Sequence, residues 1–203
     1  MTKLSWFILL SMGIAAIPGP TNLLVIAQAV AGEMRRVLLV LTGVAIANLM
    51  WVLLCSTGLA ALLLTSQVAF EALRILGAAY LAYVGIRLLL SPPARVNTQT
   101  VNMLRDKGLL IQGFLTSATN PKAILFYSAL LPQFASTSES VGVSAFAWGS
   151  LYVLIALSVF YVYALLARSL SVMLGRNSNL IQRAASLGLL GCGVALLRWR
   201  TSQ

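Results

Sequence analysis

The chain contains no histidine, and only 4 of its 203 residues are acidic. Intramembrane hydrolases need a nucleophile beside a base, and metal-dependent transferases need a cluster of metal ligands. The four acids lie at the ends of apolar segments or in the loops between them, at Glu33, Glu71, Asp106 and Glu139. We therefore expect no enzyme, no catalytic residues, no bound metal and no cofactor.

Charged residues of either sign are rare, at 9% of the chain, whereas 60% of the residues are hydrophobic. A soluble domain carries roughly 25% charged residues, so this chain is expected to be an integral membrane protein. The net charge of +10 reflects Lys and Arg, which membrane proteins concentrate in cytoplasmic loops. A nucleic-acid partner would need a basic face on a water-soluble domain, and none is expected here.

Cysteine is also scarce, with Cys55 and Cys192 both inside apolar segments. At such places cysteine is expected as a small buried hydrophobe, with a disulfide or a metal site the less favoured alternative. No phosphate-binding Gly-Lys loop is present, which excludes ATP drive within this chain. The tryptophans are expected as anchors near the membrane interfaces, to varying degrees, at Trp6, Trp51, Trp148 and Trp199.

Six apolar segments are each long enough to cross a ~30 Å hydrocarbon core as a helix. They cover residues 4–27, 37–64, 68–90, 109–132, 141–170 and 180–199. None has the strict alternation of a membrane strand, so the sequence predicts an all-α integral membrane fold with six transmembrane helices. The first segment also resembles a signal peptide, but its apolar character continues to Ala31, which favours a retained span.

The distribution of basic residues predicts the orientation of the chain. The loops after the first, third and fifth segments hold nine of the 14 Lys and Arg: Arg35, Arg36, Arg87, Arg95, Arg105, Lys107, Arg168, Arg176 and Arg183. The positive-inside rule places these loops in the cytoplasm and both termini outside. Lys3, Arg198 and Arg200 argue weakly for the opposite orientation.

The longest polar stretch, residues 91–108, divides the chain into two halves of three spans, residues 1–90 and 109–203. We expect this stretch to be a cytoplasmic hinge loop. Because three is odd, the second half enters the membrane from the opposite side. The predicted architecture is therefore two inverted three-helix repeats, an arrangement common among transporters.

The first and fourth spans each contain a helix-breaking motif, "AAIPGPTNLL" with Pro18-Gly19-Pro20 and "SATNPKAILF" with Asn120-Pro121-Lys122. Proline lacks an N–H group and clashes with the carbonyl four residues back, and glycine adds freedom. Each span is therefore expected to break near mid-membrane, with second half-helices that begin at Pro20 and Pro121.

The breaks are expected to expose backbone groups of both polarities. Unpartnered N–H groups are expected in the first turns of the second half-helices, on Thr21, Asn22, Leu23, Lys122, Ala123 and Ile124, and they suit an anion. Freed carbonyls are expected at Ile14, Ala16 and Ser117. An amino-acid zwitterion needs both kinds of group. A lysine at mid-span usually lines a functional cavity, although a proline kink by itself can serve shape alone.

The two motifs are also where the chain resembles the LysE/RhtB family of bacterial amino-acid exporters. Members have a Pro-Gly-Pro motif in the first of six helices and Asn-Pro-Lys in the fourth, as this chain does. "LGAAYLAYVGIRLL" in the third segment and "GFLTSATNPKAILFYSALLPQF" around the fourth are similar too. The match covers nearly the whole chain, and it implies two three-helix halves, a bacterial cytoplasmic membrane location and amino-acid export.

One position departs from the family pattern. Many members carry an aspartate in the second helix near "GVAIANLMW", where this chain has Asn48, and the fifth span has Ala156 where some members have an acid. Any proton coupling that depends on those acids is in doubt here. The expected substrate-binding residues are Pro18, Gly19, Pro20, Thr21, Asn22, Asn48, Asn120, Pro121 and Lys122.

The sequence therefore predicts a secondary transporter that exports small, neutral amino acids by alternating access. A cationic side chain would need an acidic partner at mid-span, and Lys122 would repel it. Export of basic amino acids or of other small zwitterions is the alternative substrate range, and a membrane assembly subunit is the alternative outside transport. The expected partners are the amino acid, the lipid bilayer and possible further copies of the chain.

Overall fold

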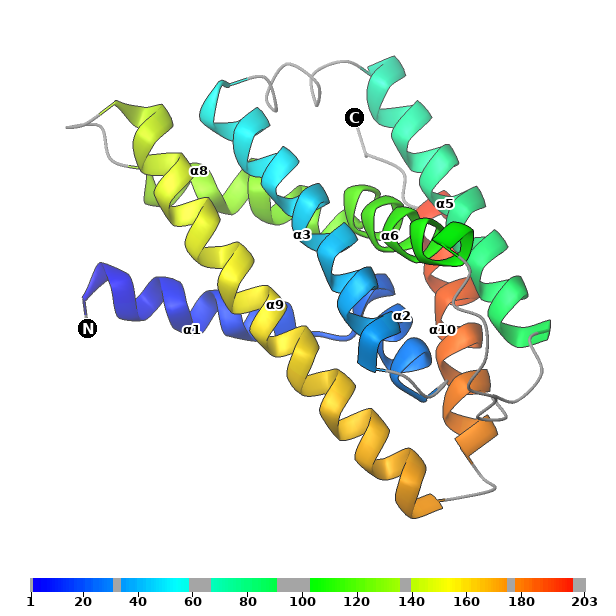
Figure 1. Ribbon diagram of the computed structural model, residues 1–203. Helices are drawn as coiled ribbons and strands as arrows, with labels where there is room; N and C mark the ends of the chain where they lie inside the picture. Colours follow the sequence, from blue (N-terminus) through cyan, green and yellow to red (C-terminus); the bar gives the residue numbers. More distant parts are fainter. Residues whose placement is uncertain are drawn as a thin grey trace.

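The computed structural model describes residues 2–30, 34–58, 67–90, 103–135, 140–174 and 178–198, and the regular secondary structure in these ranges is entirely helical (Figure 1). Most of the expected hinge, residues 91–102, lies outside the described residues, as does the C-terminus. The prediction of an all-α fold is confirmed for the described ranges.

The first break has the predicted form. Helix α1 (Lys3–Ala16) and helix α2 (Pro20–Val30) are bent by 62° relative to each other. Ile17 between them is extended, with φ −61° and ψ 125°, which is the conformation that a following proline favours. The second half-helix begins at Pro20, as predicted, because proline at the first helical position gives up no hydrogen bond.

The second break is built in the same way, between helix α6 (Met103–Ala118) and helix α7 (Pro121–Leu125). Asn120 is extended, with φ −73° and ψ 114°, and its side chain caps α7. The helix continues through the π-helical turn η1 (Phe126–Leu130) into α8 (Leu131–Phe134). This wide turn was not predicted. It fits Pro132, which lacks an N–H group and would clash with the carbonyl four residues back in a regular helix.

The remaining helices are α3 (Met34–Ser56), α5 (Gln67–Leu90), α9 (Val141–Leu174) and α10 (Ser178–Arg198). Within the described residues, α3 and residues Val141–Met173 of α9 are long and apolar enough to cross a membrane, and the bent pair α1–α2 is a third candidate if it forms one span.

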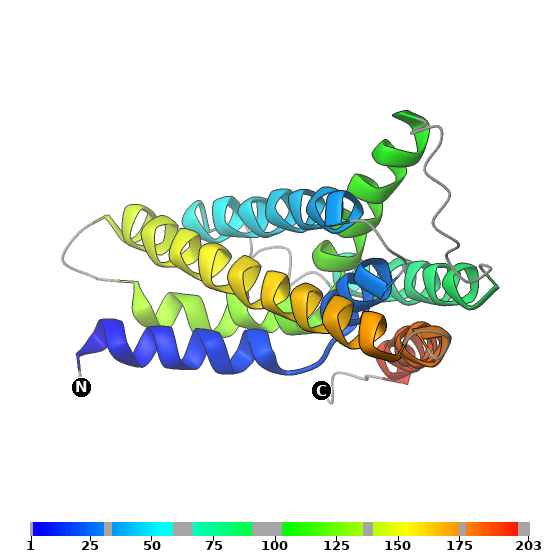
Figure 2. The same cartoon turned by 60° about the horizontal axis from the view of Figure 1, so that its bottom comes forward.

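The helices surround α2. Helix α1 runs beside the α7–α8 segment (Figure 2), and α9 packs against α1, α2 and α3. Helix α5 packs against α10 at the other end of the molecule (Figure 1). Helix α2 also contacts α3, α6 and α10, and nine of its 11 residues are buried. This enclosure buries the polar side chains of Thr21 and Asn22, whereas Ile17 and Pro18 of the first break are exposed.

The close crossing of α3 and α6 fixes the position of the second break. Gly43 and Gly113 lie at this crossing, where an added Cβ atom on Gly43 would collide with the carbonyl of Leu110 and one on Gly113 with the carbonyl of Val40. Backbone approaches this close are possible only where neither helix has a side chain. The C-terminal end of α6 is thereby held beside α3.

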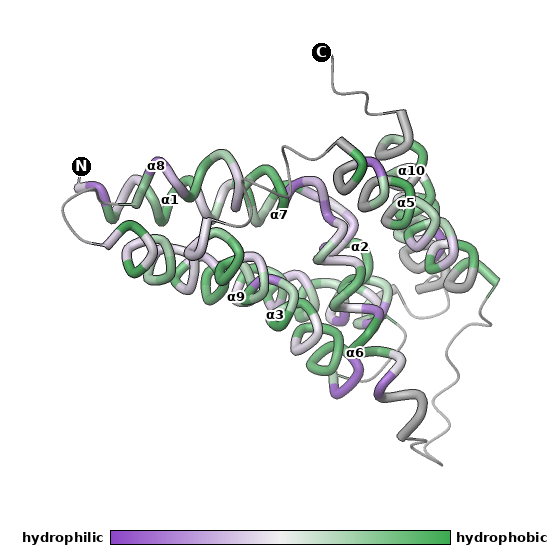
Figure 3. The backbone as a smooth tube through the Cα atoms, turned by 90° about the horizontal axis from the view of Figure 1, so that it is seen from above, coloured by the Kyte–Doolittle hydropathy of each residue, from purple (hydrophilic) through white to green (hydrophobic). Residues whose placement is uncertain are grey.

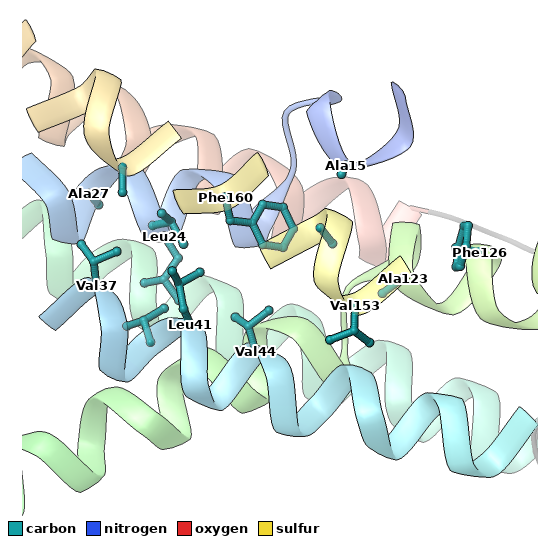
Figure 4. Packing of buried hydrophobic residues seen from close by; sticks show 14 of the residues in the cluster. Ala15, Leu24, Ala27, Val37, Leu41, Val44, Ala123, Phe126, Val153 and Phe160 are labelled. Atoms are coloured by element: carbon teal, nitrogen blue, oxygen red, sulfur yellow. The ribbon is translucent and has the colours of Figure 1, made fainter. Parts of the chain in front are cut away.

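The apolar core lies between α2, α3 and α9, where Leu24, Leu41, Val44 and Phe160 pack together (Figure 4). The outer surface is apolar as well. Leu4 is 50% exposed and Met173 is 82% exposed, and Figure 3 shows that hydrophobic residues predominate along α1, α3 and α9. Lipid is the environment that such a surface needs, because water would penalise it.

Trp51 corrects one expectation for the tryptophans. Its side chain is only 3% exposed, and its Nε1 donates a hydrogen bond to the carbonyl of Ala118 at 3.2 Å. It therefore lies in the protein interior and not at a lipid interface. Ala118 is the last residue of α6, whose final carbonyls have no partners within the helix, so the indole satisfies one of them.

Candidate functional site

The two helix breaks meet through buried polar side chains. The side-chain amide of Asn120, at the break between α6 and α7, donates a hydrogen bond to the hydroxyl of Thr21 in the first turn of α2, with a distance of 3.0 Å. Both side chains are buried, Thr21 at 1% and Asn120 at 2% exposure. The two breaks are therefore in direct contact.

Lys122 makes the second connection between the breaks. From the first turn of α7 its ammonium reaches the end of α1 and the start of α2. It donates hydrogen bonds to the carbonyl of Ile17 at 2.7 Å, to Oδ1 of Asn22 at 3.2 Å and to the carbonyl of Ala15 at 3.4 Å. An ammonium has three N–H donors, so these three neutral acceptors use its full capacity.

Gly19 of the Pro-Gly-Pro motif lies against this lysine. A Cβ atom on Gly19 would be 3.7 Å from both Cε and Nζ of Lys122. That distance is an ordinary van der Waals contact, so the lysine side chain lies directly against the backbone of the first break. The two prolines, Pro18 and Pro20, set the turn that brings this backbone there.

Asn22 holds the acceptors of Lys122 in place. Its side chain is fully buried, and its Nδ2 donates to the carbonyl of Ala15 at 3.1 Å while its Oδ1 accepts from Lys122. The carbonyl of Ala15 therefore accepts from both side chains. Because the amide bridges α1 and α2 across the break, the acceptors around the lysine form a connected network rather than separate contacts.

The carbonyls freed by the prolines are not open in this conformation, which corrects the expectation for them. The carbonyl of Ile14 accepts from the N–H of Ile17 at 3.3 Å, and that of Ser117 accepts from the N–H of Asn120 at 3.1 Å. The carbonyl of Ala16 accepts from the hydroxyl of Tyr163 on α9 at 2.7 Å. In a membrane each such group must find a protein partner.

The N–H groups at the two helix starts are also partly satisfied. Leu23 donates to the carbonyl of Gly19 at 3.0 Å and Ile124 to that of Asn120 at 3.0 Å. The N–H of Lys122 donates to Oδ1 of Asn120 at 3.0 Å. These three groups were expected to be unpartnered, and that expectation is wrong. The N–H groups of Thr21, Asn22 and Ala123 have no acceptor among the described residues.

Asn48 lies beside the second break but does not contact Lys122. It is on α3, is 3% exposed, and its Oδ1 accepts from the hydroxyl of Ser117 at a long 3.5 Å. Thr116 next to Ser117 is fully buried, and its hydroxyl has no partner among the described residues. The structure therefore connects Asn48 to the end of α6, and it places a cluster of buried polar side chains there.

Two residues of α9 at this junction were not singled out from the sequence. Tyr163 bonds the end of α1, and the ring of Phe160 lies with its centroid 5.9 Å from the ammonium of Lys122, within reach of a cation–π interaction. Figure 4 shows Phe160 within the buried cluster. Their spacing of three residues places both on one helix face, and this spacing is the sequence feature from which they could have been identified.

Residues 8–200 match the LysE type translocator family. The chain belongs to this family. The resemblance identified from the Pro-Gly-Pro and Asn-Pro-Lys motifs is thereby confirmed. This LysE-type chain is a multi-pass membrane protein, and its family consists of translocators and not of enzymes.

Several curated relatives are leucine efflux proteins. The LysE-type chain is 36% identical to that of Salmonella typhimurium over 137 residues, 66% of this chain and 64% of the relative. It is 34% identical to that of an Enterobacter species over 128 residues, 63% and 61% of the two chains. The matches therefore span less than two thirds of these relatives. A membrane protein of Vibrio cholerae without an assigned function is 28% identical over 94% of both chains. No solved structure matches the chain.

Proposed function

We propose that this LysE-type translocator exports small neutral amino acids, leucine among them, across the bacterial cytoplasmic membrane by alternating access. The observation that carries the proposal is the contact between the two helix breaks, where Lys122 of one break bonds the carbonyls of the other. Broken helices that meet at a shared site are the usual substrate site of secondary transporters. The leucine efflux relatives support this substrate class.

The junction offers groups for both ends of a zwitterion. The N–H groups of Thr21, Asn22 and Ala123 at the two helix starts favour a carboxylate, because a helix N-terminus carries partial positive charge. The carbonyls at the end of α1 and the side chain of Asn48 offer acceptors for an ammonium. The Pro18-Gly19-Pro20 and Asn120-Pro121-Lys122 motifs set the backbone that presents these groups.

The charge of the junction favours a neutral substrate. Lys122 is bonded to three neutral oxygen atoms, and Asn48 stands where an acid would support a cationic side chain. A second positive charge a few ångströms from Lys122 would be repelled by about 4 kcal/mol at an effective dielectric constant of 20. Basic amino acids are therefore the weaker candidates. An assembly subunit would not need the bonded lysine at the junction of two broken helices.

The proposed architecture is six spans in two inverted three-helix repeats, residues 1–90 and 109–203, with both termini outside. The similar construction of the breaks supports it, since each begins its second half-helix at a proline, Pro20 or Pro121. Helix α1 of the first half lies beside α7–α8 of the second. Movement of one half against the other would open this contact to either side of the membrane in turn.

The test is efflux from cells that express the unaltered protein and are loaded with a panel of amino acids. Leucine, threonine and homoserine should leave faster than from cells without the protein, whereas lysine and arginine should not. Lys122→Ala should abolish the difference, and Lys107→Ala is the matched control because Lys107 is exposed at the start of α6. Export of lysine or arginine without export of any neutral amino acid would refute the proposed substrate class.

A further inference from the structure

The oxygen atoms around the ammonium of Lys122 form a binding site for a primary ammonium. Two are backbone carbonyls at the end of α1, on Ala15 and Ile17, and the third is Oδ1 of Asn22. All three accept from one nitrogen atom, at distances between 2.7 and 3.4 Å. The side chain of Asn22 is fully buried and bonded to the carbonyl of Ala15, so these two acceptors are held in place without the lysine.

The chemistry of this cluster suits an organic ammonium ion. Three neutral acceptors match the three N–H donors of a primary ammonium, and hydrogen bonds from a charged donor are stronger than neutral ones. The ring of Phe160, with its centroid 5.9 Å from Nζ, adds a face that attracts an organic cation. A small metal ion such as sodium would find only these three oxygen atoms among the contacts of Lys122.

We propose that the carbonyls of Ala15 and Ile17 and Oδ1 of Asn22 are the subsite for the α-ammonium of the transported amino acid, and that Lys122 fills it while no substrate is bound. This inference rests on the proposed export function, and it adds the position of the substrate's charged groups. The ammonium of Lys122 occupies the position that the substrate's α-ammonium would take. Lys122 belongs to α7, whereas the acceptors lie on α2 and at the end of α1.

Binding is then an exchange of one ammonium for another. The α-ammonium of the substrate takes the three oxygen atoms, and the released ammonium of Lys122 pairs with the substrate's carboxylate. The site keeps the same net charge, because the substrate is a zwitterion and the lysine remains. An amine without a carboxylate would leave two cations side by side at low effective dielectric. The exchange also releases the bond between α7 and the end of α1, a contact between the two halves.

The first test uses purified Lys122→Ala protein and measures its melting temperature with 3-methylbutylamine, which is leucine without its carboxylate. The amine should raise the melting temperature of the variant by roughly 5–10 °C at about 100 times its Kd. It should not change the melting temperature of the unaltered protein. Tetramethylammonium, a cation with no N–H donor, should have no effect on the variant. Stabilisation by sodium chloride in place of the amine would overturn the proposal, and so would the absence of any response to the amine.

A second pair of variants tests whether the amine binds at the three oxygen atoms. In the Lys122→Ala background, Asn22→Ala should weaken amine binding by about tenfold or more, because one charge-assisted hydrogen bond is lost. Gln28→Ala is the matched control, since Gln28 is a buried amide on the same helix that bonds Gln112 instead of Lys122. Equal loss in both variants would show that the amine binds elsewhere.

The unaltered protein provides a test if Lys122→Ala does not fold. Leucine should raise its melting temperature, whereas 3-methylbutylamine and 4-methylpentanoate, which each carry one of the two charged groups, should not. If 3-methylbutylamine stabilised the unaltered protein, the proposed exchange of ammonium groups would be wrong.

The readouts also separate the two proposals. Amine binding to the variant without leucine efflux by the unaltered protein would refute the export function only, and efflux without amine binding would refute the subsite only.

Discussion

Asn120 and Thr21, which are 99 residues apart in the chain, are joined by a buried hydrogen bond of 3.0 Å from the amide of one to the hydroxyl of the other. Each residue belongs to a different helix break. The amide oxygen of Asn120 also caps α7 by accepting from the N–H of Lys122. One asparagine therefore shapes its own break and ties it to the other.

Removing this bond should cost stability. In Thr21→Ala the buried amide of Asn120 loses its acceptor, and an unsatisfied buried donor costs about 1–3 kcal/mol. The melting temperature in detergent should fall by several degrees. Thr42→Ala is the control, because Thr42 is exposed on α3 and its hydroxyl bonds only the backbone of its own helix. Equal changes in the two variants would mean that the bond between the breaks contributes nothing.

The hydroxyl of Tyr163 should matter more than that of its neighbour Tyr161. Tyr163→Phe removes the donor to the carbonyl of Ala16, which then has no partner in an apolar setting. We expect a loss of about 1 kcal/mol in the free energy of unfolding and slower leucine efflux. Tyr161→Phe, two residues away and 40% exposed, should change neither. Unaltered efflux and melting temperature in Tyr163→Phe would contradict this role.

The crossing of α3 and α6 predicts opposite effects for two glycines of α6. In Gly113→Ala the new methyl group meets the backbone of Val40, which cannot move aside, so overpacking should cost about 1–3 kcal/mol or more. Gly108→Ala meets nothing within 4 Å, and alanine favours the helix by about 0.5–1 kcal/mol. Thermal unfolding of both variants measures the contrast. A stabilised Gly113→Ala protein would show that the helices do not cross this closely.

An acid in place of Asn48 should change substrate preference. Asn48→Asp puts a carboxylate beside Ser117 and the second break, where it can pair with a cationic side chain or carry a proton. Efflux of lysine relative to leucine should rise, or leucine efflux should become more dependent on the proton gradient. Gln133→Glu adds an acid at an exposed place on α8 and should change neither the efflux ratio nor the dependence on the proton gradient. If Asn48→Asp changes neither the efflux ratio nor the dependence on the proton gradient, Asn48 is not part of the site.

Cysteine labelling from outside the cell tests the orientation. The nine basic residues in the loops after the first, third and fifth segments predict that Gln203→Cys reacts with an impermeant maleimide and that Thr98→Cys does not. The unaltered protein, with Cys55 and Cys192 in helices α3 and α10, gives the background. Labelling at Thr98→Cys without labelling at Gln203→Cys would reverse the topology.

The sequence alone determined where the helices break and what surrounds them. Pro20 and Pro121 begin new helices in the structure because a missing N–H group and a ring clash act on the chain's own preceding turn, whatever packs nearby. The sequence alone also determined the membrane environment, because a chain with 9% charged residues has too few polar groups to cover a surface that faces water.

The tertiary structure decided which groups satisfy the broken helices. The proline rule identifies the carbonyls that lose their helical partners, but not their new partners. The carbonyls of Ile14 and Ser117 accept from N–H groups three residues further along the chain, whereas that of Ala16 accepts from Tyr163, 147 residues away. The sequence predicts Lys122 as a substrate-binding residue, and packing decides that its ammonium reaches Ala15, Ile17 and Asn22. A long side chain takes whatever acceptors the neighbouring helix presents, so only the packing of α7 against α1 and α2 settles its partners.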